Sequence, residues 1–174
     1  MSTEATETLN NVNIDAVAGL IAAVNGDSAK GATNWRATVD WKGGFRSEAK
    51  IRAFDPITSD EPPALGGTDT APNPVEQVLA ALGNCLTVGY AANATARGIE
   101  ITSLRIDISG PIDLHTFLGL GGEHAGFSEV RADVFLESPA SQEDVDALHE
   151  HVLRTSPVGH TLQAAIPVTI SLAV

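Results

Sequence analysis

Cys85 is the only cysteine of this chain, and its thiolate would be the strongest nucleophile that the sequence offers. A lone thiol cannot form a disulfide within its own chain. Three roles are open to it: an inert core residue, a reactive nucleophile or a bridge between chains. Cys85 stands midway along an apolar run over residues 73–97, too far from a helix start for the helix dipole to favour the thiolate. A reactive Cys85 would therefore need a nearby cation.

Two other groups of residues could carry chemistry. Ser156 could be a nucleophile with His160 as its base, but no glycine elbow precedes it and no third group is evident, which favours a loop serine before Pro157. His149 and His151 lie two residues apart on a predicted helix, so they face different sides and lack the spacing of a helical metal pair. Neither a phosphate-binding glycine loop nor a dinucleotide fingerprint occurs, and we expect no metal and no cofactor.

The composition argues against several classes of partner. The chain has 174 residues, 43% of them apolar, which suits one domain or one subunit of an oligomer. Its formal net charge of -12 repels nucleic acids and anionic membrane surfaces. No apolar stretch approaches the roughly 20 residues of a membrane span. The first residues are polar and acidic, unlike a secretory signal, and the single cysteine makes a cytoplasmic location the expectation.

The element that carries Cys85 is predicted to be a long helix from Asn73 to Arg97. Asn73 can cap its start, Pro74 suits the first helical position, and Glu76 completes a capping box. About 24 residues at about 1.5 Å each give a length of roughly 36 Å. Most of the circumference is apolar or small, which predicts burial on most sides. A twin subunit could supply that cover.

The spacing of apolar residues predicts further elements around this helix. Strands and helices are partly segregated along the chain, which favours an α+β fold with an antiparallel-rich sheet. In chain order, the patterns predict a polar leader (1–13), a helix (15–24), a β-hairpin (33–41 and 45–54), a loop (55–72), the long helix, a strand (101–109), a loop (110–126), a strand (130–136), a helix (141–154) and a terminal strand (167–174).

The segment over residues 65–85, LGGTDTAPNPVEQVLAALGNC, resembles the signature of the OsmC/Ohr superfamily, the osmotically inducible and organic hydroperoxide resistance proteins. In that family a proline, one or two acidic or amide residues and an apolar, alanine-rich run precede a helix cysteine. The resemblance covers about residues 33–174, an OsmC-like domain, and leaves residues 1–32 as a leader with a short helix. It implies an OsmC-like fold: an intertwined homodimer with long central helices wrapped by antiparallel-rich β-sheets.

The resemblance also implies roles for particular residues. Peroxidases of the family attack a hydroperoxide with the helix cysteine, here Cys85, and resolve the sulfenic acid with the cysteine of a Cys-Pro pair. That pair reads Ser156-Pro157 here, so the resolving cysteine is missing and no disulfide can close within the chain. Arg46 best matches the family's essential arginine on its first hairpin. The alternatives for this cation are Arg36, Arg52 and Arg154.

A second departure concerns the glutamate at the helix start. Its usual place in the family, ten residues before the cysteine, is Val75 here, and the acid is Glu76. Nine residues at about 100° each put Glu76 about 180° around the helix from Cys85 and about 14 Å along it. Either the helix begins with a kink or Glu76 serves another role, and the capping box is the favoured one.

Two functions remain open. The first is a thiol-dependent, peroxiredoxin-like reduction of small organic hydroperoxides in oxidative stress defence, with Cys85 attacking, Arg46 holding the thiolate and an external thiol as reductant. The second is a non-catalytic OsmC-like module that binds an apolar small molecule in its interhelical pocket. The retained Cys85 favours the first function, and the serine at position 156 favours the second. Either function would involve a second copy of the chain and a small molecule, without nucleic acid or membrane.

Overall fold

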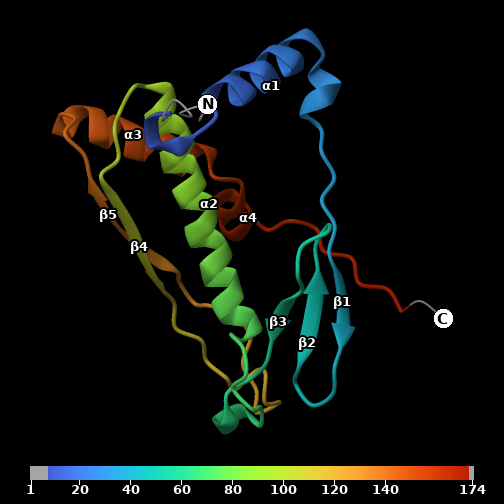
Figure 1. Cartoon of the computed structure of the whole chain (residues 1–174). Coiled ribbons are helices and arrows are strands. Elements are labelled where there is room, and N and C mark those ends of the chain that lie inside the picture. The colour runs from blue at the N-terminus through green and yellow to red at the C-terminus, as the bar shows by residue number, and fades with distance from the viewer. Residues whose placement is uncertain (1–7, 173–174) are drawn as a thin grey trace, which may run out of the picture. The chain divides into compact units, whose positions relative to one another are not determined.

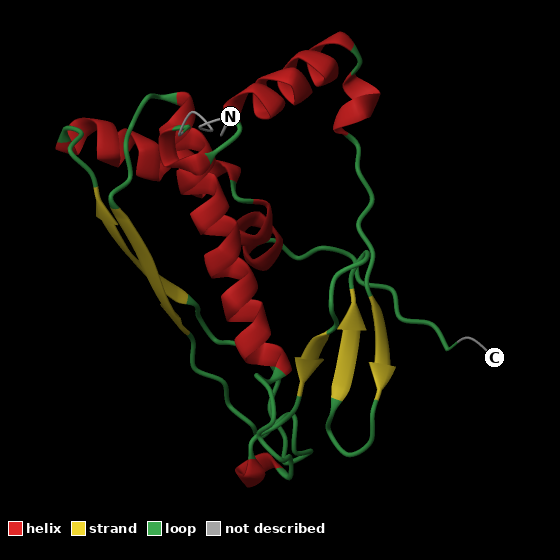
Figure 2. Cartoon of the chain, viewed as in Figure 1, coloured by secondary structure: helices red, strands yellow, loops and turns green. Residues whose placement is uncertain are grey.

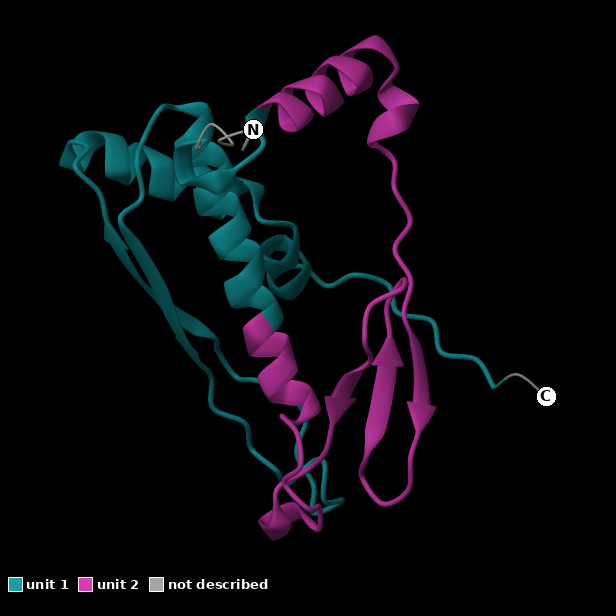
Figure 3. Cartoon of the chain, viewed as in Figure 1, with its two compact units in different colours: residues 1–14, 81–174 teal, residues 15–80 magenta. Residues whose placement is uncertain are grey.

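The computed structural model describes residues 8–172. The chain divides into two compact units (Figure 3): residues 15–80 form one, and the described parts of residues 1–14 and 81–174 form the other. Helices and antiparallel strands together make the α+β fold that the sequence predicts (Figure 2). The domain boundary expected between residues 32 and 33 stays a prediction.

The unit over residues 15–80 contains an antiparallel sheet in the order β1-β2-β3 (Figure 1). Its first two strands, β1 (Thr38–Trp41) and β2 (Ser47–Lys50), form the expected hairpin with shorter strands than the alternating pattern suggests. The turn between them contains Gly43 at φ +95° and Gly44 at φ +58°, a left-handed region that glycine enters without strain. The glycines therefore allow the tight reversal that pairs the two strands.

Two further elements belong to the N-terminal half of the chain. β3 (Ile57–Ser59) pairs antiparallel with β2, so the loop expected over residues 55–72 is a wrong prediction for these three residues. A strand this short leaves no alternating pattern to detect. α1 (Ile14–Gly26) confirms the short helix expected over residues 15–24.

The loop between β3 and the long helix is built around the buried carboxylate of Asp60. This carboxylate accepts hydrogen bonds from the N–H and hydroxyl of both Thr68 and Thr70, and from the N–H of Glu61. These bonds, led by that of the Thr68 hydroxyl, hold the pKa of Asp60 far below its ordinary value. Gly67 is required in the loop, because a Cβ there would lie 1.8 Å from the Glu61 carbonyl oxygen. One carboxylate thus organises the segment that leads into the long helix.

The long helix, α2 (Pro74–Ala96), is a single unbroken α-helix, as expected (Figure 1). Its capping box is confirmed: the Glu76 N–H donates to Asn73 Oδ1 and the Asn73 N–H donates to Glu76 Oε2, each at 2.9 Å. Val88 is 68% exposed, so the burial expected on most sides is not reached within one chain. The buried apolar side chains form one stripe at four-residue spacing: Leu82, Leu86, Tyr90 and Ala94.

The other unit builds its core between that stripe, two strands and a helix. β4 (Ser103–Ser109) pairs antiparallel with β5 (Arg131–Glu137), and both confirm strands expected from the sequence. α3 (Gln142–Thr155) confirms the helix expected over residues 141–154. Its Leu148 and Val152 are each 0% exposed and join the α2 stripe in one cluster.

The C-terminal part of the chain departs from expectation. α4 (Pro157–Gln163) is a helix that the apolar spacing does not indicate. The terminal strand expected over residues 167–174 is a wrong prediction for residues 167–172, which pair with no strand, and residues 173–174 lie outside the described part. The alternating apolar side chains are present but exposed, Ile170 at 92% and Leu172 at 91%. Alternation alone does not make a strand, because a strand also needs a neighbour to pair with.

The remaining loop follows the prediction. Residues 110–126 contain no helix or strand, apart from an isolated bridge between Ile112 and Phe127. Among the helices of the described residues, none has both the length and the apolar character needed to cross a membrane.

Asn10, in the part of the leader that the structure describes, is hydrogen-bonded to residues at and just after the end of α2. Residues 9–11 form a 3₁₀ turn, and the Asn10 side-chain amide donates to the Thr95 hydroxyl at 3.0 Å and to the Ile99 carbonyl at 2.9 Å. The Ile101 N–H donates back to Asn10 Oδ1 at 2.8 Å. One side chain therefore bridges the end of the helix and the segment that leads to β4.

Candidate thiol site

The sulfur of Cys85 and the hydroxyl of Ser156 lie side by side, although 71 positions separate them in the chain. The distance from Cys85 Sγ to Ser156 Oγ is 3.3 Å, and either atom could be the donor. Cys85 projects from α2 and is half-buried, whereas Ser156 lies between α3 and α4 and is 5% exposed. The two positions that the family resemblance singles out are thus in contact within one compact unit, and their chemical roles stay predictions.

Local helix capping fixes the position of Ser156. Its Oγ accepts the N–H of Gly159 at 3.1 Å, which caps α4, and Pro157 occupies the first helical position. A Cβ at Gly159 would lie 3.0 Å from Ser156 Oγ, so the backbone packs closely against the hydroxyl. Ser156 is therefore a helix cap and not the loop residue that its sequence context suggests.

A pocket of about 480 Å³ lies near this pair, lined by neighbours of the two residues and not by Cys85 or Ser156 themselves. Leu82, one turn before Cys85 on α2, and Gly159, which is bonded to Ser156, both line it. Mainly apolar walls with a few polar groups suit a small organic molecule. The other lining residues with side chains that could contact such a molecule are His124, Phe127, Ser128, Glu129, Val130, Leu162 and Gln163.

Glu76 and Arg46, the other two predicted site residues, lie in the unit over residues 15–80. The Glu76 carboxylate accepts the Asn73 N–H in the capping box, and α2 runs without a break from there to Cys85. The capping interpretation is therefore confirmed, and a part for Glu76 in the chemistry stays a prediction. Arg46 ends the β1–β2 turn, where its N–H donates to the Gly43 carbonyl at 3.2 Å. Its contact with Cys85 also stays a prediction.

Two of the three alternative arginines have partners of their own. Arg154 of α3 pairs with Glu150 at 3.5 Å, with both side chains largely exposed. The Arg52 guanidinium lies 4.6 Å from the ring centre of Phe54. Arg36 lines a pocket on the unit over residues 15–80.

The histidines do not form the arrangements considered from the sequence. The His160 N–H donates to the Ser156 carbonyl at 2.9 Å, and no hydrogen bond between the His160 ring and the Ser156 hydroxyl occurs among the described residues. Within residues 8–172, no three His, Cys, Asp or Glu side chains gather as metal ligands.

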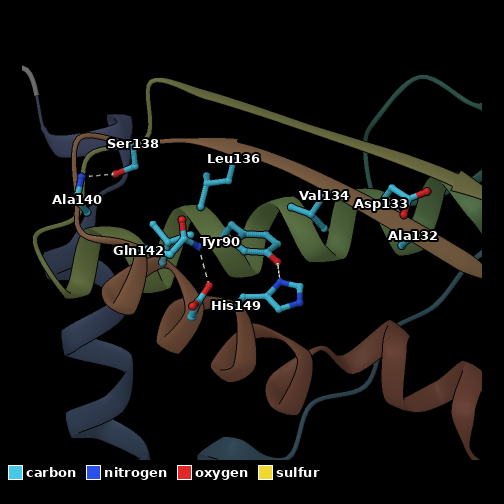
Figure 4. A pocket seen from close by; sticks show the side chains of 11 residues that line it. Tyr90, Ala132, Asp133, Val134, Leu136, Ser138, Ala140, Gln142 and His149 are labelled. Carbon is cyan, nitrogen blue, oxygen red and sulfur yellow. Dashed lines mark hydrogen bonds between the residues drawn. The ribbon is translucent and has the colours of Figure 1, made fainter.

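Tyr90 and His149 form a partly buried polar contact that the sequence analysis does not predict (Figure 4). The Tyr90 hydroxyl is hydrogen-bonded to His149 Nδ1, and the two rings stack with centres 6.1 Å apart. Tyr90 is 1% exposed, and burial raises the pKa of Tyr90 to about 12, so the phenol stays protonated at neutral pH. The four-residue spacing after Leu86 is the signal that places Tyr90 on the buried stripe. This contact borders a second pocket, of about 480 Å³, between β5 and α3.

Comparison with known proteins agrees with this fold. The model of the OsmC-like protein family matches residues 67–171, which is more than half of the chain, and the chain belongs to this family. No curated protein matches it.

Solved structures show the same fold at low sequence identity. An OsmC-like protein from Mycoplasma pneumoniae is 21% identical, with a TM-score of 0.64 over 75% of this chain and 88% of that one. An organic hydroperoxide resistance protein from Elizabethkingia anophelis is 17% identical, with a TM-score of 0.55 over 75% and 90%. An organic hydroperoxide resistance protein OsmC from Legionella pneumophila is 15% identical, with a TM-score of 0.53 over 76% and 92%.

Proposed function

We propose that this protein reduces small organic hydroperoxides with Cys85 as its one reactive thiol and an external thiol as reductant. The observation that carries the proposal is the sulfur of the half-buried Cys85, held 3.3 Å from the Ser156 hydroxyl. A mainly apolar pocket lies nearby, lined by Leu82 and Gly159 among others. Half-burial leaves the sulfur accessible to a small molecule, and the pocket suits the organic part of one. Membership of the OsmC-like family gives further support. So do the hydroperoxide resistance proteins among the solved structures that this chain resembles.

The reaction balances without a second cysteine in the chain. The Cys85 thiolate attacks one peroxide oxygen, so that an S–O bond forms, the O–O bond breaks and an alcohol leaves after taking up a proton. One external thiol then attacks the sulfenic acid, forming a mixed disulfide and releasing water. A second external thiol frees Cys85 and leaves as a disulfide. In this scheme Arg46 supplies the cation beside the thiolate, and Glu76 contributes by holding the start of α2.

Peroxide consumption measured with and without thiol tests the proposal. We expect the protein to consume tert-butyl hydroperoxide in the presence of dithiothreitol, above the background of dithiothreitol alone. The Cys85→Ser variant should lose this activity while keeping its thermal unfolding midpoint. An activity that is equal in the two proteins, or absent from both, would contradict the proposal.

The second candidate is a non-catalytic module that binds an apolar small molecule. It is favoured by Ser156 in place of a resolving thiol and by the mainly apolar pocket near Leu82. For this function, small apolar ligands should raise the unfolding temperature equally in the wild-type protein and in Cys85→Ser. Peroxide turnover that depends on Cys85 would argue against it.

For either function we propose a homodimer. Several large apolar side chains are exposed in the single chain, and a second copy would cover them as the family resemblance implies. The most exposed are Trp35, Trp41, Val88, Val168, Ile170 and Leu172. Sedimentation at micromolar concentration should give twice the mass of one chain, 18.0 kDa, and a stable folded monomer would contradict the dimer.

The cellular location and the classes of partner that we propose follow from charge and redox chemistry. We propose a cytoplasmic location, because a single-thiol cycle needs a supply of reduced thiols. The net charge of -12 disfavours nucleic acid and anionic membranes as partners.

A further inference from the structure

The Ser156 hydroxyl has one hydrogen to donate, and its surroundings leave few acceptors for it. Its oxygen already accepts the Gly159 N–H at 3.1 Å, which uses one of its lone pairs and none of its donor capacity. The other contact of this oxygen among the described residues is Cys85 Sγ at 3.3 Å. At 5% exposure the hydroxyl has little access to water. A buried donor without an acceptor is costly, and the Cys85 sulfur is the acceptor that lies within reach of this hydroxyl among the described residues.

We infer that Ser156 donates its hydroxyl hydrogen to the Cys85 sulfur and thereby favours the thiolate over the thiol. A bond to a charged acceptor is markedly stronger than a bond to a neutral one, whereas a neutral thiol is only a weak acceptor. The bond is therefore worth more when Cys85 is ionised. Ser156 occupies the place of the family's resolving cysteine. It acts there as a positioning residue that increases the reactivity of Cys85.

The surrounding geometry keeps the hydroxyl in this orientation. Gly159 lies close to Ser156: a Cβ added to this glycine would be 3.0 Å from Ser156 Oγ and 3.2 Å from Ser156 Cβ. Pro157, in the first turn of α4, fixes its own backbone φ and restricts the residue before it. The hydroxyl therefore has a fixed partner on the α4 side and Cys85 on the α2 side.

The charged groups on the neighbouring elements are directed elsewhere. Arg154 at the end of α3 pairs with Glu150 at 3.5 Å, and both side chains are more than half exposed. His160 on α4 is exposed as well. Among the described residues of this compact unit, the hydrogen bond with Ser156 is thus the polar interaction of the Cys85 side chain.

The inference rests on the proposed function only for its biological purpose, and its test is independent of peroxide turnover. The rate of Cys85 alkylation by iodoacetamide is measured from pH 6 to 10 in the full-length protein. In Ser156→Ala and in Ser156→Gly, the pH of half-maximal rate should rise by about one unit, which equals about 1.4 kcal/mol of lost preference for the thiolate. The rate at pH 7 should fall up to about tenfold.

The paired variants separate this role from helix capping. Glycine is nearly as good a cap as serine and alanine is a poor one, so an effect that passes through α4 would appear in Ser156→Ala and be small in Ser156→Gly. Ser141→Ala is the matched control, because Ser141 caps α3 in the same way, accepting the Asp144 N–H at 3.2 Å. It should leave the alkylation profile unchanged.

Three results would overturn the inference: unchanged profiles in both Ser156 variants, a shift in Ser156→Ala alone, or an equal shift in Ser141→Ala. A shift in both Ser156 variants without peroxide turnover by the wild-type protein would support the hydrogen bond and reject the proposed function.

Discussion

The substitution Ser156→Cys should allow a disulfide between position 156 and Cys85 after treatment with an organic hydroperoxide. Cys85 Sγ lies 3.3 Å from Ser156 Oγ, whereas the sulfurs of a disulfide are about 2.05 Å apart, so the two atoms must approach by about 1.2 Å. Small side-chain rotations can supply such a movement. The peroxide converts Cys85 to the sulfenic acid, and the introduced thiol then displaces water to form the S–S bond.

The stabilisation from this bond follows from the length of chain it would close, 71 positions. In the chain-entropy model, a loop of that length removes about 15 cal/mol/K from the unfolded state, about 4.4 kcal/mol at 25 °C. For a chain of this size, 1 kcal/mol shifts the Tm by about 2–4 °C, so the oxidised variant should melt roughly 9–18 °C higher before strain is subtracted.

Intact mass under non-reducing conditions and thermal melting with and without reductant are the two assays. The variant should lose two hydrogens within one chain, and reductant should remove the gain in Tm. The wild-type protein, which has no second thiol, should show oxygen addition to Cys85 instead. Two free thiols, or two separately over-oxidised thiols, in the variant would refute the argument from the 3.3 Å contact.

Three further substitutions test the fold that holds the site. Gly67→Ala should lower stability by at least about 1–3 kcal/mol in urea unfolding, because its Cβ would meet the Glu61 carbonyl at 1.8 Å; an unchanged midpoint would contradict this contact. The stability contributed by Asp60 should be complete above about pH 4 and decline as the pH falls below it, because the Thr68 hydroxyl and the other donors lower its folded-state pKa. Asp60→Asn should weaken that decline between about pH 4 and 2, and parallel curves for the two proteins would speak against it. Leu148→Ala removes a side chain that is 0% exposed and should cost about 2–5 kcal/mol; a loss well below about 1 kcal/mol would mean that the core collapses around the gap.

Local chemistry made the main helices predictable from the sequence. The capping box of Asn73 and Glu76 predicts the start of α2 to within one residue, because the side chains that satisfy the first free N–H groups are encoded next to the helix. The same kind of signal was present for α4, where a capping serine precedes a proline at the first helical position. Without apolar spacing beside it, however, a serine before a proline indicates only a loop.

Pairing and tertiary contact were less predictable. β3 and the unpaired residues 167–172 show that short strands depend on which segment lies beside them, which apolar alternation does not encode. The contact between Cys85 and Ser156 depends on how α4 packs next to α2, so residue spacing could not reveal it. The family resemblance alone pointed to both positions.

The bridge made by Asn10 bears on how far this chain can be shortened. The family model begins at residue 67, and a chain trimmed to that boundary would lose the amide that holds the Ile99 carbonyl and the Ile101 N–H. Both groups would then depend on water, and the last turn of α2 would fray more readily. Limited proteolysis around Arg97 should therefore be faster in a chain that lacks residues 1–11 than in the full-length protein. Asn10, which precedes the residues matched by the family model, thus holds the end of the helix that carries the thiol.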